Sequence, residues 1–281
     1  MGLFSKLFRI KKEPKKIKIG LALGSGGAKG FAELGAKKAF EENGVEFDMF
    51  AGTSIGSILG AFFADGYTST DVFELLRGVD FNEIKTLFMI KMDTSGLFDV
   101  IDRYIGSLTF EELKKPFRAV ATELETGSEK VFDKGSVAKA LCASSAMPPF
   151  FKPVVIDDKR YVDGAFANSV PADVLRGLGA DYVIGIDLKN HEEKSGIISK
   201  IIPTFKGVVD EPWRKGYENS DVMLHPDLTG FRATSFFDGN EMYEIGYRTA
   251  IEYMPKIKAE ISALTGEKNK GKKCKGTKEK V

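Results

Sequence analysis

Several residue types that define common protein chemistries are scarce in this sequence. Its 281 residues include only two cysteines and two histidines. Cys142 and Cys274 lie far apart, and Cys274 falls in a polar tail, so the pattern excludes a disulfide framework and indicates a reducing compartment. Any chemistry that relies on an imidazole base has only His191 and His225 as candidates.

Long hydrophobic runs are also missing. No stretch approaches the ~20 apolar residues that a membrane-spanning helix needs, and the N-terminus does not have the composition of a signal peptide. We therefore expect a cytoplasmic protein. Residues 1–12, MGLFSKLFRIKK, have the spacing of a short amphipathic basic helix that lies in a membrane interface. Peripheral binding to the inner face of the membrane is thus a further hypothesis.

The sequence has no large excess of charge of either sign, since its formal net charge is +1. The charges are unevenly placed, however: residues 1–18 carry +6 and residues 266–281 carry +5, which leaves −10 on residues 19–265. An acidic body with two basic ends does not fit a nucleic-acid-binding surface. The ends fit either contact with an anionic membrane surface or solvated tails that aid solubility.

Hydrophobic patterning predicts an α/β fold. Strand-like segments at 17–23 and 45–51 alternate with helix-like segments at 31–43 and 55–66, which is the rhythm of a parallel sheet covered by helices. For the rest of the chain we predict mostly helix over 69–115, strands over 117–124, 129–135, 159–163 and 182–188, helices over 136–147, 172–180 and 240–264, and an irregular surface segment over 189–215.

The domain organisation follows from these elements. Residues 17–265 form one predicted domain of a size near the upper end of the usual range for a single domain. A basic amphipathic segment, 1–16, precedes it. The lysine-rich tail, 266–281, follows it and has too few apolar residues for us to expect it to fold.

A glycine-rich loop lies between the first predicted strand and helix, from Gly24 to Gly30. The spacing excludes a Walker A loop, because Lys29 precedes Gly30 and Phe31 follows it, and excludes the dinucleotide pattern, because position 29 is not glycine. Unobstructed N–H groups at a helix N-terminus suit an oxyanion or a phosphate. A purely structural tight turn is the alternative.

The segment from Gly52 to Gly56 has the G-x-S-x-G pattern of serine hydrolases, with Ser54 between a predicted strand and helix. The base that would take its proton is open at this point. His191 and His225 lie downstream in polar surroundings, whereas Asp163 ends a predicted strand before Gly164. An ordinary Asp-Gly turn is the alternative interpretation of Asp163.

Together these motifs resemble the patatin-like phospholipase family, in particular its short bacterial members. The resemblance extends over about residues 17–262 and rests on four ordered blocks: the glycine loop, the serine turn, ASSAMPPFFKP at 143–153, and Asp163-Gly164-Ala165 followed by Asn168 and Pro171. It implies a single-domain, three-layer α/β/α fold with a mainly parallel central sheet. It also implies a Ser–Asp dyad that works without histidine.

By this resemblance Ser54 is the nucleophile and Asp163 the base. The residues implied for the oxyanion hole are Gly26 and Gly27 as N–H donors, Gly30 as the shaping residue of the turn, and Lys29 where the family often has arginine. Gly52, Gly56 and Gly164 support the motifs. The implied substrate is an acyl ester of a phospholipid, a lysophospholipid or another long-chain lipid. No cofactor and no metal are expected, since Asp157-Asp158 and Glu192-Glu193 lack ligand spacing.

Two other functions remain compatible with the sequence. One is an acyltransferase that uses the same acyl-serine, and the other is an inactive protein of this fold that binds lipids or partners. An apolar-rich segment, 81–98, would wall an acyl-chain site, form a lid or belong to the core. The same alternatives apply to Phe231, Phe236 and Phe237.

Overall fold

The computed structural model of the protein describes residues 16–78, 101–189 and 211–266. In chain order its strands, helices and 3-10 helices (η) are β1 (Ile19–Leu23), η1 (Gly27–Gly30), α1 (Phe31–Glu42), β2 (Met49–Thr53), α2 (Ile55–Ala64), α3 (Ser69–Arg77), η2 (Phe110–Glu112), β3 (Phe117–Glu123), β4 (Glu129–Phe132), α6 (Val137–Ser144), β5 (Val154–Ile156), β6 (Lys159–Asp163), η3 (Gly164–Phe166), α7 (Ala172–Gly177), β7 (Tyr182–Ile186), α9 (Arg214–Asn219), β8 (Val222–Leu224), η5 (Phe236–Asp238) and α10 (Gly239–Thr265).

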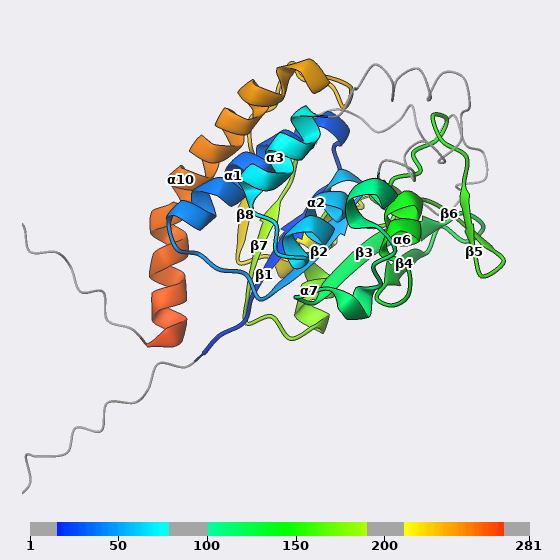
Figure 1. Ribbon diagram of the computed structural model, residues 1–281. Coiled ribbons are helices and arrows are strands. Elements are labelled where there is room, and N and C mark those ends of the chain that lie inside the picture. The colour runs from blue at the N-terminus through cyan, green and yellow to red at the C-terminus, as the bar shows by residue number, and fades with distance from the viewer. Residues whose placement is uncertain (1–15, 79–100, 190–210, 267–281) are drawn as a thin grey trace, which may run out of the picture.

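Within the described ranges the strands form one eight-stranded sheet (Figure 1). Neighbouring strands follow the order β5-β6-β3-β2-β1-β7-β8, and β4 also pairs with β3. The neighbouring strands β3, β2, β1, β7 and β8 are parallel to one another. Strands β4 and β6 pair antiparallel with β3, and β5 pairs antiparallel with β6. The mainly parallel sheet predicted from the sequence is therefore confirmed. In such sheets ligands bind beyond the carboxyl ends of the strands.

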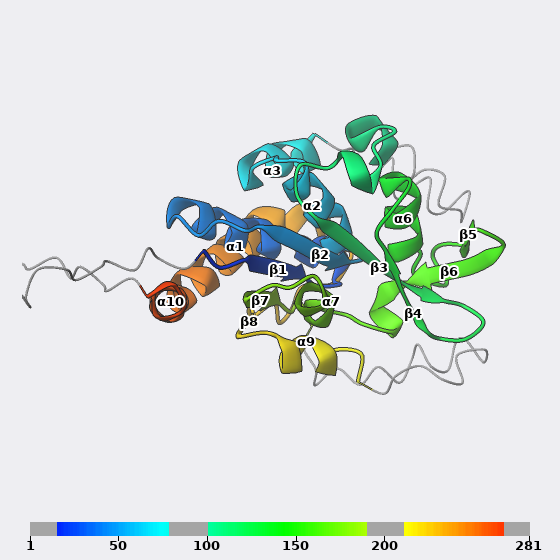
Figure 2. The same cartoon turned by 90° about the horizontal axis from the view of Figure 1, so that it is seen from below.

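Helices cover both faces of the sheet and give the predicted three layers. Figure 2 shows α1, α2, α3 and α10 on one face and α7 and α9 on the other, and α6 packs with α2 on the first face. All residues of β1, β2 and β7 are buried, as expected for central strands covered on both sides. None of the helices in the described ranges is long and apolar enough to span a bilayer.

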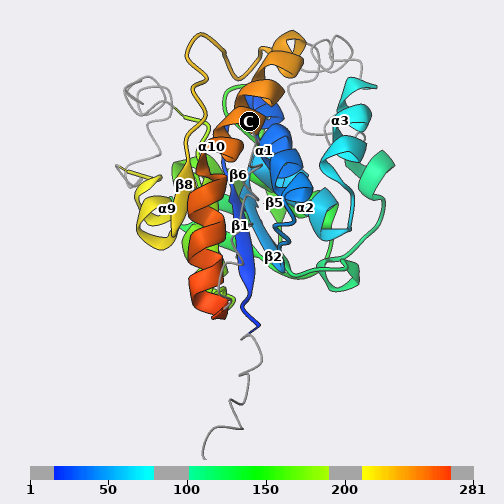
Figure 3. The ribbon, with the colours of Figure 1, turned by 90° about the vertical axis from the view of Figure 1, so that its left-hand side faces the viewer.

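The long helix α10 lies directly against α1 (Figure 3). Two glycines, Gly35 in α1 and Gly246 in α10, make this close approach possible. A side chain on Gly246 would overlap the carbonyl of Ala32, and one on Gly35 would overlap the carbonyl of Tyr243. The two helix backbones are therefore in contact, and this contact fixes the helix that follows the glycine loop.

The structure corrects part of the predicted element map. The segment predicted to be irregular over 189–215 lies mostly outside the described residues, but α9 already begins at Arg214. The strands β5 and β8 were not predicted, because three residues are too few to show a period. Of the helix predicted over 69–115, α3 and residues 101–105 are helical and η2 is a short 3-10 turn, whereas residues 106–109 and 113–115 are not helical.

The apolar residues to which the sequence assigned no single role lie in different surroundings. The segment 81–98 lies outside the described residues, as do nearly all of the two basic ends. Phe231 and Phe236 pack against the main hydrophobic core. Phe237 is 82% exposed, so it is neither a core residue nor a wall of a buried acyl site.

Candidate active site

Ser54 lies in a sharp turn between a strand and a helix. Thr53 ends β2 and Ile55 begins α2, and Ser54 between them adopts φ 57° and ψ −125°. Such a backbone conformation costs a non-glycine residue about 1–3 kcal/mol. The flanking glycines permit the bend, because a side chain on Gly52 would overlap the Gly56 carbonyl. The predicted strand–turn–helix around Ser54 is thus present.

Asp163 reaches the same place from β6. In the sheet β3 lies between β2 and β6, with Thr53 paired to Val120 and Asp163 paired to Ala121. The ends of β2 and β6 are therefore held at the same level on either side of one strand. A side chain on Gly164 would overlap the Val120 carbonyl, so the turn after Asp163 packs directly on β3.

The side chains of Ser54 and Asp163 are hydrogen-bonded. The Ser54 hydroxyl donates to Oδ2 of Asp163 at 2.6 Å, and Oδ1 accepts the Ala165 N–H at 2.8 Å. Burial raises the pKa of Asp163 from 3.8 to about 6, while these hydrogen bonds and the charge of Lys189 limit the rise. The carboxylate is thus a stronger base than an exposed one, and its orientation is fixed.

The glycine loop, residues 24–30, leads from β1 into η1 and α1 next to this pair. Gly27 has φ +58°, in the left-handed region where glycine is favoured. Gly30 packs on Ile55, the residue after Ser54, so closely that any side chain on Gly30 would displace it. The loop is therefore held against the N-terminus of the helix that follows the serine.

The N–H groups of the loop are used in different ways. Ala28 donates to the carbonyl of Ala233 at 2.8 Å, and Lys29 donates to the carbonyl of Gly26 at 3.2 Å. No acceptor among the described residues contacts the N–H groups of Gly26 and Gly27. Within the described part of the chain, these two donors are therefore not used by other residues.

A buried carboxyl group holds the start of the loop. Oε1 of Glu33, in α1, accepts the Gly24 N–H at 2.6 Å, and Oε2 has no hydrogen-bond partner in the described part of the chain. Burial raises the pKa of Glu33 well above its usual range, and the nearby charge of Asp187 adds to the rise while the Gly24 N–H opposes it. Glu33 therefore ties the loop to α1 without requiring a full charge.

Two lysines bring positive charge to this edge of the sheet. Lys29 is only 9% exposed, and Lys189 follows β7, where its N–H donates to Oδ1 of Asp187 at 3.0 Å. Burial lowers the pKa of Lys189, the carboxylates of Asp163 and Asp187 oppose this, and the charge of Lys29 adds to it. The Lys189 ammonium group is thus within electrostatic reach of both Asp163 and Lys29.

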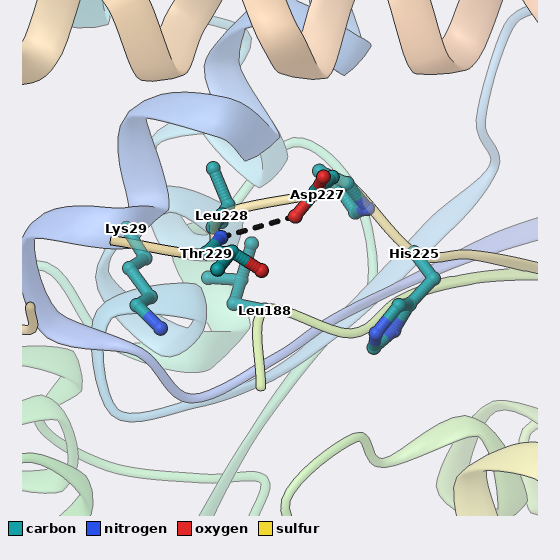
Figure 4. Close-up of a pocket in the computed structure, with 7 residues that line it drawn as sticks. Lys29, Leu188, His225, Asp227, Leu228 and Thr229 are labelled. Carbon is teal, nitrogen blue, oxygen red and sulfur yellow. Dashed lines mark hydrogen bonds between the residues drawn. The ribbon is translucent and has the colours of Figure 1, made fainter. Parts of the chain in front are cut away.

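A cavity of about 260 Å³ lies next to the glycine loop and is lined by Lys29, Leu188 and residues 225–229. Figure 4 shows Lys29 and His225 at opposite sides of it, with Leu188 between them. Within the lining, Oδ1 of Asp227 accepts the Thr229 N–H at 3.1 Å. The cavity therefore adjoins the side of the loop that carries Lys29.

Among the described residues, His225 is not hydrogen-bonded to Ser54. Nδ1 of His225 lies 3.5 Å from the hydroxyl of Tyr217, and no hydrogen bond joins His225 to Ser54 in the described ranges. His191 lies outside the described residues. Of the three candidate bases, the structure brings Asp163 to Ser54.

Three residues that support the site were not singled out from the sequence. Ser144 accepts the Ser54 N–H, and Glu33 and Lys189 have the contacts given above. Ser144 falls within ASSAMPPFFKP, which resembled a family block but suggested no role. Glu33 lies in the helix predicted over 31–43 and Lys189 begins the irregular segment predicted over 189–215, and no motif marks either position.

Curated proteins with similar sequences were found in animals and bacteria. The chain is 30% identical over 190 residues to "Neuropathy target esterase sws" of Drosophila melanogaster and 32% identical over 192 residues to "Patatin-like phospholipase domain-containing protein 7" of Mus musculus. It is 29% identical over 181 residues to an uncharacterized NTE family protein of Mycobacterium tuberculosis. Each match covers 62% of this chain, but only 13%, 14% and 50% of the respective relative.

Comparison with solved structures agrees on the fold. The crystal structure of VipD from Legionella pneumophila superposes with a TM-score of 0.56 at 14% sequence identity, over 86% of this chain and 67% of that one. The model of the family described as "Patatin-like phospholipase" matches residues 21–176, more than half of the chain, including the glycine loop, Ser54 and Asp163. The chain belongs to the patatin-like phospholipase family.

Proposed function

We propose that the chain hydrolyses acyl ester bonds of lipids, with Ser54 as the nucleophile and Asp163 as the general base. The observation that carries this proposal is the 2.6 Å hydrogen bond from Ser54 Oγ to Asp163 Oδ2. The raised pKa of Asp163 and the available N–H groups of Gly26 and Gly27 support it. Membership of the family supports the lipid substrate.

In the first half of the proposed reaction, Asp163 takes the proton of Ser54 while Oγ forms a bond to the ester carbonyl carbon. The charge that develops on the carbonyl oxygen is stabilised by the N–H groups of Gly26 and Gly27, and one such donor contributes about 3–4 kcal/mol. The bond from carbon to the alcohol oxygen then breaks, and protonated Asp163 gives its proton to that oxygen.

The second half releases the acyl group. Asp163, now ionised again, takes a proton from a water molecule that attacks the carbonyl carbon of the acyl-serine. The bond from this carbon to Ser54 Oγ breaks, and Oγ receives the proton from Asp163. The fatty acid leaves, and the same carboxyl group has served as base and acid in each half.

Charge near the site favours a lipid with an anionic head group. Lys189 lies within electrostatic reach of Asp163 and Lys29 within reach of Lys189, at the edge of the sheet where ligands bind in this fold class. A phosphate on the alcohol part of the ester complements that charge, so phospholipids and lysophospholipids are the proposed substrates. The basic ends, 1–18 and 266–281, would hold the protein at the anionic, cytoplasmic surface of a membrane.

The test compares the full chain with its Ser54→Ala variant on lysophospholipid micelles, with released fatty acid measured by mass spectrometry. The wild-type protein is expected to release fatty acid and to be labelled at Ser54 by a fluorophosphonate. Ser54→Ala is expected to lose at least about 10³-fold in rate, because the nucleophile is absent. Ser128→Ala, at an exposed position in the loop between β3 and β4, is the matched control and should keep the wild-type rate. Folded wild-type protein without labelling at Ser54 would contradict the proposal.

The wild-type enzyme should also show a pH dependence set by Asp163. Only the ionised base accepts a proton, so kcat/KM is expected to rise with pH through an apparent pKa of about 6 and to level off above it. The measurement uses an acyl ester that does not titrate in this range. A midpoint near the ordinary pKa of 3.8 would contradict the role of the buried carboxylate. A midpoint that disappears in His225→Ala would assign the base to histidine.

A further inference from the structure

The backbone N–H of Ser54 has a specific side-chain partner. Oγ of Ser144, the last residue of α6, accepts this N–H at 2.9 Å and donates its own hydrogen to the Val120 carbonyl at 2.6 Å. Ser144 is fully buried. Because its hydrogen is committed to Val120, a lone pair of Oγ is directed at Ser54.

Ala146, two residues after Ser144, binds the backbone of Asp163. The carbonyl of Ala146 accepts the backbone N–H of Asp163 at 3.1 Å. On the other side, the Thr122 hydroxyl donates to the Asp163 carbonyl at 2.9 Å. Residues 144–146 therefore bind the backbones of both Ser54 and Asp163, which are 109 positions apart in the chain.

The conformation of Ser54 explains why such a contact matters. Its φ of 57° lies in the left-handed region, which is unfavourable for serine. The Ser54 carbonyl accepts two hydrogen bonds from Ser57, one from its backbone N–H at 2.9 Å and one from its side-chain hydroxyl at 2.6 Å. On the N–H side of the residue the partner is Ser144. Loss of that hydroxyl would leave a buried donor unpaired and allow the strained peptide to rotate.

We propose that Ser144 is a positioning residue of the active site, whose hydroxyl holds the Ser54 peptide so that Oγ stays aligned with Asp163. This proposal rests on the proposed role of Ser54 as nucleophile. It also commits the Ser54 N–H to Ser144, which leaves Gly26 and Gly27 as the donors to the substrate oxyanion.

The test measures the rate of fluorophosphonate labelling and kcat and KM in Ser144→Ala, with Ser136→Ala as the matched control. Ser136 caps the other end of α6, where its side chain accepts the Lys139 N–H, so its loss weakens the same helix without touching Ser54. Ser144→Ala is expected to be labelled about 30- to 100-fold more slowly than wild type. In hydrolysis, kcat should fall by a similar factor, whereas KM should change little. Ser136→Ala should stay within about twofold of wild type.

The pH profile separates positioning from a merely structural role. The hydrogen bond from Ser54 lowers the pKa of Asp163, so a misaligned hydroxyl should move the acid limb of the Ser144→Ala profile to higher pH. The limb of Ser136→Ala should not move. If Ser144→Ala does not fold, Ser144→Cys is measured instead, because a thiol keeps the shape but is a weak acceptor.

Each outcome decides a different point. A folded Ser144 variant with the labelling rate and pH profile of Ser136→Ala would overturn the positioning role. If wild-type protein is labelled quickly at Ser54 and the Ser144 variant slowly, but no acyl lipid is cleaved, then the positioning stands and the proposed substrate fails. Wild-type protein that is not labelled at Ser54 would overturn both.

Discussion

Asp163→Asn is expected to lower kcat/KM for acyl-ester hydrolysis by about 10³- to 10⁴-fold, the upper part of the range for loss of a general base. A carboxamide has nearly the same shape as the carboxylate and can still accept the Ala165 N–H. It cannot take a proton from Ser54, however, so the hydroxyl would attack without being deprotonated. The fold should remain, because the carboxamide keeps the shape of the side chain and the Ala165 hydrogen bond, and only the hydrogen bond from the Ser54 hydroxyl is changed. The measurement is steady-state hydrolysis at pH 8, where wild-type Asp163 is ionised.

Two controls separate this effect from general damage. Asp158→Asn makes the same substitution in the turn at the other end of β6, where φ of 60° suits asparagine equally well, and it should keep full activity. His225→Ala tests the imidazole alternative and should also stay close to wild type. If Asp163→Asn stays within tenfold of wild type, or if His225→Ala abolishes turnover, the Ser54–Asp163 dyad is wrong.

Gly246→Ala is expected to lower the free energy of unfolding by about 2–4 kcal/mol, which makes it the largest expected effect on stability. The new methyl group would overlap the carbonyl of Ala32, and backbone atoms cannot move aside as a flexible side chain would. Either α10 moves away from α1, or both helices shift along their contact. Urea unfolding followed by circular dichroism measures the change.

The control for this substitution is Gly177→Ala. Gly177 ends α7, and a side chain there would meet no atom within 4 Å. Alanine favours helix over glycine by up to about 1 kcal/mol, so the control should be neutral or slightly stabilising. Equal destabilisation by both substitutions would show that the α1–α10 contact is not the cause.

Local sequence patterns predicted the main features of the fold and the turn that carries Ser54. The alternation of apolar segments gave the parallel sheet, and the spacing around Ser54 gave the strand–turn–helix, because both depend on neighbours in the chain. The choice of Asp163 over His225 came from the resemblance to a family. The pairing of both strands with β3 now supplies a structural reason for that choice.

The features that were missed depend on contacts between distant residues. Ser144 meets Ser54 across 90 positions, and no period or turn signal marks such a contact. Gly35 and Gly246 resemble weak points in helices when only propensity is considered, although they are where two helices meet. The strand β8 has three residues and no alternation that could distinguish it from a loop.

The burial of Asp163 also links the proposed chemistry to the stability of the protein. Its pKa is about 6 in the folded chain against 3.8 when exposed, so its contribution favours folding below pH 4 and is lost as the pH rises through 6. Through this group alone, the free energy of unfolding is about 3 kcal/mol lower at pH 8 than below pH 4. The protein would therefore take up a proton on folding between about pH 4 and 6, and the pH range in which the proposed base is ionised is the range in which its burial no longer favours folding.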